Sequence, residues 1–243
     1  MRSYAVTDVG RVRKNNEDSL LQSDMHRLYA VADGMGGHNA GEVASLIAVE
    51  TLYLYEMTTG INGVDNFKEA FAEANRNILQ TSMQERSTYG MGTTLTAVKI
   101  IGEYALYGHI GDSRLYFLND RLCYQLSEDH SLVWEHFRAG ILTKEECRFH
   151  PQKNIITKAL GQFEDVDLDL GVIKLRRDGL FLLCSDGLTD MLSEAAIKSI
   201  VKAHYRSPER ILEVLHREAL SAGGVDNISF LMLVFDAEDG AKA

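Results

Sequence analysis

The chain has 243 residues, of which 45% are hydrophobic and 25% charged, ordinary values for a globular protein. Acidic residues outnumber basic ones 35 to 25, and the net charge of −10 argues against nucleic acids and anionic membrane surfaces as partners. No run approaches the ~18 apolar residues of a membrane span. Three widely spaced cysteines indicate reduced thiols in a cytoplasmic protein. We expect one domain over residues 1–243, with a core at about 3–235 and a frayed tail at 237–243.

Short apolar or β-branched runs bounded by Gly, Asp or Asn predict strands, and apolar residues three or four apart predict helices. In chain order, the predicted elements are a strand at 28–32, helices at 42–57 and 64–80, strands at 93–101, 104–108, 115–118, 172–175 and 180–184, helices at 194–203 and 207–220, and a strand at 228–235. Strands as close as 93–101 and 104–108 require tight hairpins, so the pairing should be mainly antiparallel. This order predicts an α+β fold in which helices cover packed sheets.

Each predicted helix should turn one apolar face toward the core. The cleanest stripe, with steps of three and four, consists of Val64, Phe67, Phe71, Ala74 and Ile78. In the helix at 42–57, the residues expected to face inward are Val43, Leu46, Ile47, Leu54 and Met57. Ser207 and Pro208 are typical N-cap and first residues of the last helix.

Aspartates mark the ends of the predicted buried strands. Their positions are Asp33, Asp112, Asp186 and Asp226, each next to or near Gly or Asn. Asp190 follows Asp186 by four residues, so the two would share one face of a helical turn and repel each other unless a cation lies between them. Oxygen ligands without a His/Cys cluster favour Mg²⁺ or Mn²⁺ over zinc.

Glycines beside these acids, as in Asp33-Gly34-Met35-Gly36-Gly37-His38, let the backbone approach a ligand closely. The stretch lacks the Lys-Ser/Thr of a nucleotide-binding P-loop. Arg13 is either a surface residue or a bidentate grip on a phosphate beside the metals.

These residues fall in an ordered series of motifs over roughly residues 3–235. They are RKNNEDS (13–19), VADGMGGHNAGEVAS (31–45), GTTLTA (92–97), GHIGDSRLY (108–116), LSEDHSLV (126–133), HPQKNIITKALG (150–161), LLCSDGLTDML (182–192) and GGVDNIS (223–229). The chain thereby resembles the metal-dependent Ser/Thr protein phosphatases of the protein phosphatase 2C type, in their compact bacterial form.

The resemblance implies an antiparallel β-sandwich flanked on both faces by pairs of helices, with a dinuclear metal cleft at one end. In this sequence the implied ligands of two tightly bound Mn²⁺ or Mg²⁺ ions are Asp33, which bridges them, the Gly34 carbonyl, Asp186 and Asp226. Asp112 matches a ligand of a third, weaker metal, with Asp190 nearby.

Other residues match supporting positions of the family. Glu17 and Asp18 match carboxylates that hold metal-bound water, Asn227 matches a residue behind the ligands, and Arg13 matches the phosphate-binding arginine. Residues 132–160 match a flap that selects substrates. Animal members carry a histidine, the proposed general acid, directly after Asp-Gly; here Met35 stands there and His38 follows. The general acid is therefore His38 or a metal-bound water, and His38 has a structural role in the second case.

The implied activity is hydrolysis of phosphoserine and phosphothreonine in protein substrates by a metal-bridging hydroxide, opposing a Ser/Thr kinase, with a monomer as the default state. A catalytic Ser185 lacks the surrounding GxSxG elbow, and Cys184 ends an apolar strand. His109, His130 and His150 are expected to be structural or flap residues. A phosphatase-like binding module that has lost catalysis is the rival from another class, and metal-dependent hydrolysis of p-nitrophenyl phosphate would separate the two.

Overall fold

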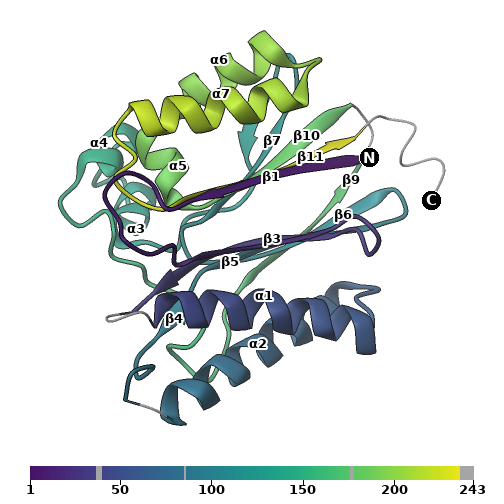
Figure 1. Cartoon of the computed structure of the whole chain (residues 1–243), viewed down its shortest axis with the longest axis vertical. Helices are drawn as coiled ribbons and strands as arrows, with labels where there is room; N and C mark the ends of the chain where they lie inside the picture. The colour runs from purple at the N-terminus through teal and green to yellow at the C-terminus, as the bar shows by residue number, and fades with distance from the viewer. Residues whose placement is uncertain (37–39, 85, 176–177, 236–243) are drawn as a thin grey trace.

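A computed structural model describes residues 1–36, 40–84, 86–175 and 178–235 of the chain. It contains two antiparallel sheets that pack face to face (Figure 1). The strand order of the first sheet is β1 (Arg2–Asp8), β11 (Ile228–Phe235), β10 (Gly179–Cys184), β7 (Arg114–Leu118) and β8 (Cys123–Gln125). That of the second is β2 (Asp18–Ser23), β3 (Leu28–Met35), β5 (Leu95–Ile101), β6 (Tyr104–Ile110) and β9 (Asp169–Lys174), with β4 (Gly92–Thr93) paired to the end of β3.

Helices cover the outer face of each sheet. The second sheet carries α1 (Gly41–Thr58) and α2 (Val64–Gln84), and the first carries α5 (Asp186–Met191), α6 (Glu194–His204) and α7 (Pro208–Ser221). Two short helices, α3 (Leu132–Arg138) and α4 (Lys144–Phe149), stand at one end of the sandwich, on the left of Figure 1. The predicted antiparallel α+β sandwich with helices on both faces is therefore confirmed. Within the described ranges, no helix combines the length and the apolar character needed to cross a membrane.

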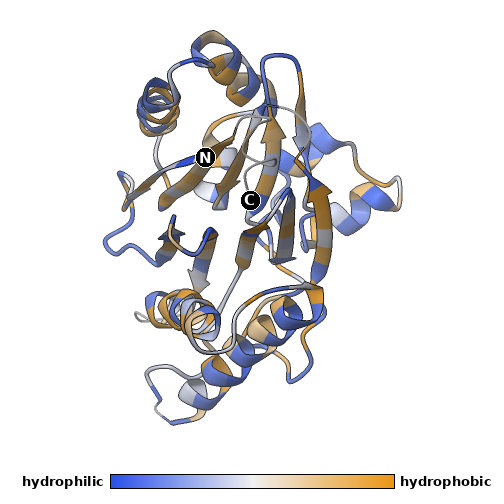
Figure 2. Ribbon diagram, turned by 90° about the vertical axis from the view of Figure 1, so that its right-hand side faces the viewer, coloured by the Kyte–Doolittle hydropathy of each residue, from blue (hydrophilic) through white to orange (hydrophobic). Residues whose placement is uncertain are grey.

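The core has three apolar layers, which explains why the central strands are apolar along their whole length. Along β10, Phe181 and Leu183 point into the layer between the sheets, whereas Leu180 and Leu182 point toward α6 and α7. Successive strand residues face opposite sides, and both sides of this strand are covered. The apolar strands run through the centre of Figure 2 in orange.

The sequence patterns missed several elements that the structure contains. These are β1, β2, β8, α3, α4 and α5. The three strands lie at sheet edges, where one side is open and polar residues are tolerated, so they lack a continuous apolar run. The three helices have six or seven residues, too few for a periodic stripe.

The expected inward face of α1 was wrong in part. Val43 and Ile47 pack against the core, but Leu46, Leu54 and Met57 are exposed. The buried face consists instead of Ala44, Ala48, Leu52 and Tyr55, together with Val49. The small residues among these let α1 lie close to β3. The stripe predicted for α2 is confirmed for Phe67, Phe71, Ala74 and Ile78, which are fully buried.

Two stacked histidines join β6 to the loop after β8. The rings of His109 and His130 have centroids 4.9 Å apart. His109 Nε2 lies 2.9 Å from the Glu128 carbonyl, which only accepts, so this nitrogen carries the proton and Nδ1 accepts from the Thr96 hydroxyl at 2.9 Å. The imidazole is thus satisfied in its neutral form, and burial lowers the pKa of His109 to about 4.

This neutral histidine should make stability depend on pH. Between the ordinary pKa of 6.5 and the folded pKa of about 4, the unfolded chain binds a proton that the folded chain does not. The free energy of unfolding should therefore fall by about 1.4 kcal/mol per pH unit as the pH drops through this window. His109→Gln stays neutral, so its deficit relative to the wild type, measured by urea unfolding in EDTA at pH 7 and pH 4.5, should shrink at the lower pH. If the free energy of unfolding fell equally in both proteins between pH 7 and pH 4.5, His109 would not be the neutral buried group.

Candidate active site

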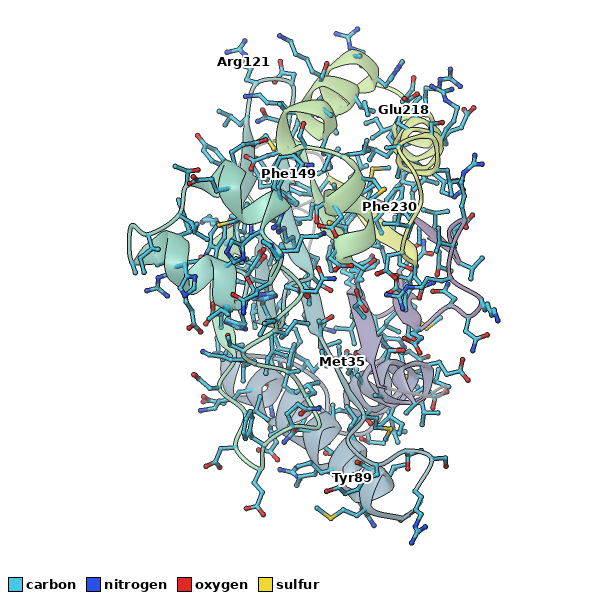
Figure 3. The ribbon with its side chains drawn as sticks, turned by 90° about the vertical axis from the view of Figure 1, so that its left-hand side faces the viewer. Met35, Tyr89, Arg121, Phe149, Glu218 and Phe230 are labelled. Carbon is cyan, nitrogen blue, oxygen red and sulfur yellow. The ribbon has the colours of Figure 1, made fainter. Side chains whose placement is uncertain are left out.

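The predicted aspartates meet at one end of the sandwich. β3, β6 and β10 all run toward this end, and β11, antiparallel to β10, begins there. Asp33 lies in β3, Asp112 and Asp186 follow β6 and β10 by two residues, and Asp226 precedes β11 by two. Figure 3 looks onto this end, with Met35 in its lower part and Phe149 in its upper part. Residues from distant parts of the sequence therefore share one small region.

Strand pairing adds a fifth carboxylate to the group. β2 and β3 pair so that Asp18 stands directly opposite Asp33. The Ser185 hydroxyl donates to Asp18 Oδ2 at 2.8 Å and accepts from the Ser229 N–H at 3.2 Å. Asp18 Oδ1 is buried and has no hydrogen-bond partner among the described residues. Ser185 thus holds one carboxylate oxygen of Asp18, and the other oxygen can accept a hydrogen bond from a ligand. We call these aspartates the carboxylate cluster; its members are Asp18, Asp33, Asp112, Asp186 and Asp226, with Asp190 beside them.

Backbone contacts hold the Asp33–Gly34 segment. The Asp33 N–H donates to Thr94 Oγ1 at 2.9 Å, and the Gly34 N–H donates to the Glu17 carbonyl at 3.1 Å. A Cβ on Gly34 would lie 2.0 Å from the carbonyl oxygen of Gly41, at the start of α1. Only glycine fits where this helix meets the strand, which explains the Asp-Gly pair physically.

Helix α5 supplies two further carboxylates. Asp186 is its first residue and Asp190 its fifth, so both face the same side, as the spacing predicted. A Cβ on Gly187 would lie 1.9 Å from the Asn227 carbonyl oxygen, so the first turn of α5 packs directly on the Asp226–Asn227 segment. The glycine after Asp186 is what allows this contact.

The side chain of Asn227 holds the loop between β1 and β2. Its amide accepts from the Glu17 N–H at 2.8 Å and donates to the carbonyls of Val9 and Asn15 at 3.0 and 2.9 Å. The loop carries Arg13 and Glu17, so a buried asparagine beside Asp226 fixes where these two residues stand.

Two side-chain cations contact the cluster. Arg13 donates from NH2 to Asp226 Oδ2 at 2.7 Å, although its side chain is 50% exposed. Lys153, in the segment after α4, pairs with Asp190 Oδ2. The sequence indicated Arg13 as a phosphate ligand, and nothing in the pattern pointed to Lys153.

The cluster is electrostatically strained. Burial raises the pKa of Asp33 well above its ordinary value, and the negative charges of Asp18, Asp186, Asp112 and Asp226 raise it further. Burial likewise raises the pKa of Asp186, followed by the charges of Asp112 and Asp190. The pKa of Asp112 rises to about 7 and that of Asp18 to about 6, in both cases mainly through burial. Several buried carboxylates with raised pKa values mark a site that needs positive charge.

The donor set fits a hard divalent cation. The available groups are carboxylates and the Gly34 carbonyl, and the buried unpaired oxygen of Asp18 is aimed at no protein donor. Within the described residues, no three Asp, Glu, His or Cys side chains already share one ligand arrangement. Asp226 and Asp190 face Arg13 and Lys153, and a bound cation would take over part of that pairing.

A cavity of about 390 Å³ opens beside the cluster, between the α3–α4 segment and helices α5 and α6. Asp112, Asp186 and Asp190 line one part of it, and Lys144, Arg148 and Lys153 line another. At its base, Arg114 makes a bidentate pair with the buried carboxylate of Asp129, with the shortest N–O distance 2.5 Å. The residues expected to form a flap therefore form one wall of this cavity.

The other residues singled out from the sequence are His38, the C-terminal tail, the possible nucleophiles Ser185 and Cys184, and His130. His38 and the tail at 237–243 lie outside the described residues. Ser185 is fully buried and engaged by Asp18, and burial raises the pKa of Cys184 to about 12, so neither offers a free nucleophile. His130 accepts from the Gly111 N–H at 3.1 Å and so braces the turn before Asp112, a role that its motif did not reveal.

Comparison with known proteins finds related phosphatases. Residues 11–222 match the family described as protein phosphatase 2C. The chain is 41% identical to protein phosphatase PhpP of Streptococcus pneumoniae, over 98% of this chain and 99% of that protein. It is 39% identical to the serine/threonine phosphatase stp of Listeria monocytogenes, over 95% of this chain and 94% of the other.

Solved structures show the same relationship. The serine/threonine phosphatase PstP/Ppp of Mycobacterium tuberculosis superimposes with a TM-score of 0.88 and 36% identity, covering 97% of this chain and 98% of that one. The catalytic domain of a PstP phosphatase, solved in complex with two manganese ions, gives a TM-score of 0.86 and 35% identity, with coverage of 97% and 98%.

The strained cluster predicts opposite effects of one substitution with and without metal. In EDTA at pH 8, Asp33→Asn should raise the melting temperature, because it removes a buried charge whose pKa is raised by folding. With Mn²⁺ at 100 times its Kd, the wild type should gain about 2.7 kcal/mol, or roughly 5–10 °C, and Asp33→Asn much less. Thermal unfolding measures both, and Asp120→Asn, 59% exposed in the turn between β7 and β8, is the control. A wild type that Mn²⁺ does not stabilise would contradict the metal site.

Proposed function

Since the chain belongs to the protein phosphatase 2C family of metal-dependent Ser/Thr protein phosphatases, we propose that it hydrolyses phosphoserine and phosphothreonine esters at the carboxylate cluster. The observation that carries the proposal is the placement of Asp18 opposite Asp33, beside Asp112, Asp186 and Asp226, in a buried group of like charges. Burial and neighbouring charges raise the pKa of Asp33 and Asp186, so divalent cations would stabilise the charged form of the group.

We assign the metal-binding roles by position. Asp33 and the Gly34 carbonyl would hold one ion, Asp33 would be shared with a second, and Asp186 and Asp226 would complete that second site. Asp112 and Asp190 would hold a third and weaker ion. When bound, Mn²⁺ or Mg²⁺ would supply the charge that acidifies water and neutralises phosphate oxygens.

The protein's own residues prepare the attacking water and the ester. Asp18, fixed by Ser185 through one oxygen, offers its free oxygen as a hydrogen-bond acceptor for water in the cluster. Glu17 stands next to it on the loop held by Asn227. Because Ser185 and Cys184 are buried and engaged, direct attack by water is favoured over a covalent phosphoenzyme.

Arg13 is placed to bind the phosphate of the substrate. Its guanidinium reaches the cluster at Asp226 yet is half exposed, so it can turn from the carboxylate to an incoming phosphate with little loss of solvation. A planar fork matches two phosphate oxygens. The ion pair thus positions the arginine at the mouth of the site before the ester arrives.

The physiological setting follows from the activity. We propose that the enzyme removes phosphate added by a Ser/Thr kinase and acts as a monomer in the cytoplasm. The buried free thiols of Cys147 and Cys184 support a reducing compartment.

Metal dependence tests the proposal directly. Hydrolysis of p-nitrophenyl phosphate should require Mn²⁺ or Mg²⁺, stop in EDTA and return with Mn²⁺, because the available ligands are oxygens. A domain that only binds phosphoproteins would show no turnover. Activity that survives exhaustive chelation, or that needs zinc, would disprove the proposed site.

Substitutions of the proposed metal ligands should reduce kcat by different amounts. Asp33→Asn should reduce kcat most, because the charge it removes acts on two ions. Asp186→Asn and Asp226→Asn should each cost several kcal/mol of transition-state stabilisation, roughly a hundredfold or more in kcat. Asp112→Ala should slow turnover of phosphopeptides while calorimetry still finds the two tight Mn²⁺ sites. Near wild-type kcat in all four variants at saturating Mn²⁺ would refute the assignment.

Arg13 should act mainly on substrate binding. Arg13→Ala should raise KM by about tenfold, roughly 1.4 kcal/mol, the scale of one charged hydrogen-bonded contact, and should lower kcat less. Affinity for Mn²⁺ should not fall, because the substitution frees Asp226. Arg13→Lys should restore only part of the loss, since an ammonium cannot span two oxygens. Steady-state kinetics on one phosphopeptide and Mn²⁺ calorimetry measure these effects. An unchanged KM in Arg13→Ala would show that Arg13 is a surface residue with no role in binding the substrate.

A further inference from the structure

A second groove lies at the active end of the molecule, on the side of β3 and β4. Its volume is about 260 Å³, and its lining includes Met35, Ile156, Thr157 and Phe163. We call these four residues the apolar rim. Their side chains include three large apolar groups: Phe163 is 66% exposed, and Met35 and Ile156 are partly buried. Large apolar side chains gathered at a hollow are typical of recognition surfaces.

The apolar rim is continuous with the carboxylate cluster. Met35 and Asp33 are two residues apart in β3, so their side chains emerge from the same face of the strand, about 7 Å apart. A polypeptide advances at most about 3.6 Å per residue. A substrate whose phosphorylated side chain reaches the cluster therefore brings residues two or three positions away to the rim.

Hydrogen bonds fix the backbone of the loop that carries Phe163. Asn75 of α2, which is 1% exposed, accepts from the Gly161 N–H at 2.7 Å and donates to the carbonyls of Phe163 and Glu164 at 2.8 and 3.2 Å. Leu160 and Thr93 exchange two backbone hydrogen bonds of 2.9 and 3.1 Å. A buried side chain and a strand thus fix the backbone while the aromatic ring remains in solvent. An aromatic group on a pre-ordered backbone binds with little loss of entropy.

Charge distinguishes this groove from the cavity on the other side of the cluster. That cavity is lined by several acids and bases. Among the described residues that line the rim groove, Lys158 alone is charged, and it is paired with Asp167 at 2.6 Å. A charged side chain would gain nothing from such a surface, whereas an apolar one would bury its area there.

We propose that the apolar rim binds an apolar side chain of the phosphoprotein substrate, two or three residues from the phosphorylated residue. The proposal rests on the phosphatase activity proposed above and adds a preference for substrates. The partner it names is an extended segment with a residue such as leucine, isoleucine or phenylalanine near phosphoserine or phosphothreonine.

The test uses the full chain and a set of synthetic phosphopeptides. Each contains one phosphoserine in a serine and glycine background, with leucine, glutamate or serine placed singly at positions −3 to +3. For the wild type with Mn²⁺, leucine at one or two of these positions should raise kcat/KM about tenfold over serine, the usual scale for filling an apolar pocket. Glutamate at the same positions should give no gain.

Variants locate the preference. Phe163→Ala should reduce the leucine preference to below about threefold and leave p-nitrophenyl phosphate hydrolysis unchanged, because that substrate has no flanking residues. Phe149→Ala is the matched control, since Phe149 is 76% exposed at the same end of the molecule but outside the groove (Figure 3).

The outcomes separate this proposal from the activity itself. A wild type that hydrolyses the small ester with Mn²⁺ but shows no leucine preference at any position would overturn the apolar rim alone. A preference that survives Phe163→Ala and disappears in Phe149→Ala would assign recognition to the α3–α4 segment instead. Absence of metal-dependent hydrolysis of the small ester would overturn the proposed function before any peptide is compared.

Discussion

Five aspartates are gathered at one end of a close-packed sandwich, and their mutual repulsion is the constraint on which the site depends. Asp33 is enclosed by the negative charges of Asp18, Asp112, Asp186 and Asp226, and burial raises its pKa further. The surrounding scaffold does not neutralise these charges fully. It contributes Arg13 and Lys153 at the periphery, on Asp226 and Asp190, and the centre is where we propose that cations from solution bind. Their binding would offset the cost in stability of burying like charges together.

Neutral groups hold the acids in place. The Thr94 hydroxyl accepts from the Asp33 backbone, Ser185 donates to Asp18, and Asn227 fixes the loop of Arg13 and Glu17. Hydrogen bonds of this kind orient a carboxylate without cancelling its charge, so its capacity to bind a cation is preserved. The apolar rim is built in a similar way, because Asn75 orders the backbone of Phe163 and leaves its ring exposed. In both places buried polar side chains set the geometry of groups that must meet a ligand.

Prediction from the sequence succeeded where burial was two-sided and failed where it was partial. The strand at 228–235 was predicted to the residue, because both of its faces are covered and its apolar run is unbroken. β1 and β2 were missed, since an edge strand needs no such run. The inward face of α1 was misassigned in part, because Ala44 and Ala48 face the core while Leu46 and Leu54 are exposed. Hydrophobicity alone does not report how near two elements approach.

By itself, the sequence determined the identity of the chemical groups: oxygen ligands, glycines beside them, an arginine at the mouth and motifs in a recognisable order. These are local properties, written in residue types and spacing. Only the tertiary structure decided the pairing of Asp18 with Asp33, the engagement of Ser185, the ion pairs of Arg13 and Lys153, and the joining of Met35, Ile156 and Phe163 into one rim. Each of these joins residues far apart along the chain, and their separation in space is set by sheet register and helix packing, which no local pattern encodes.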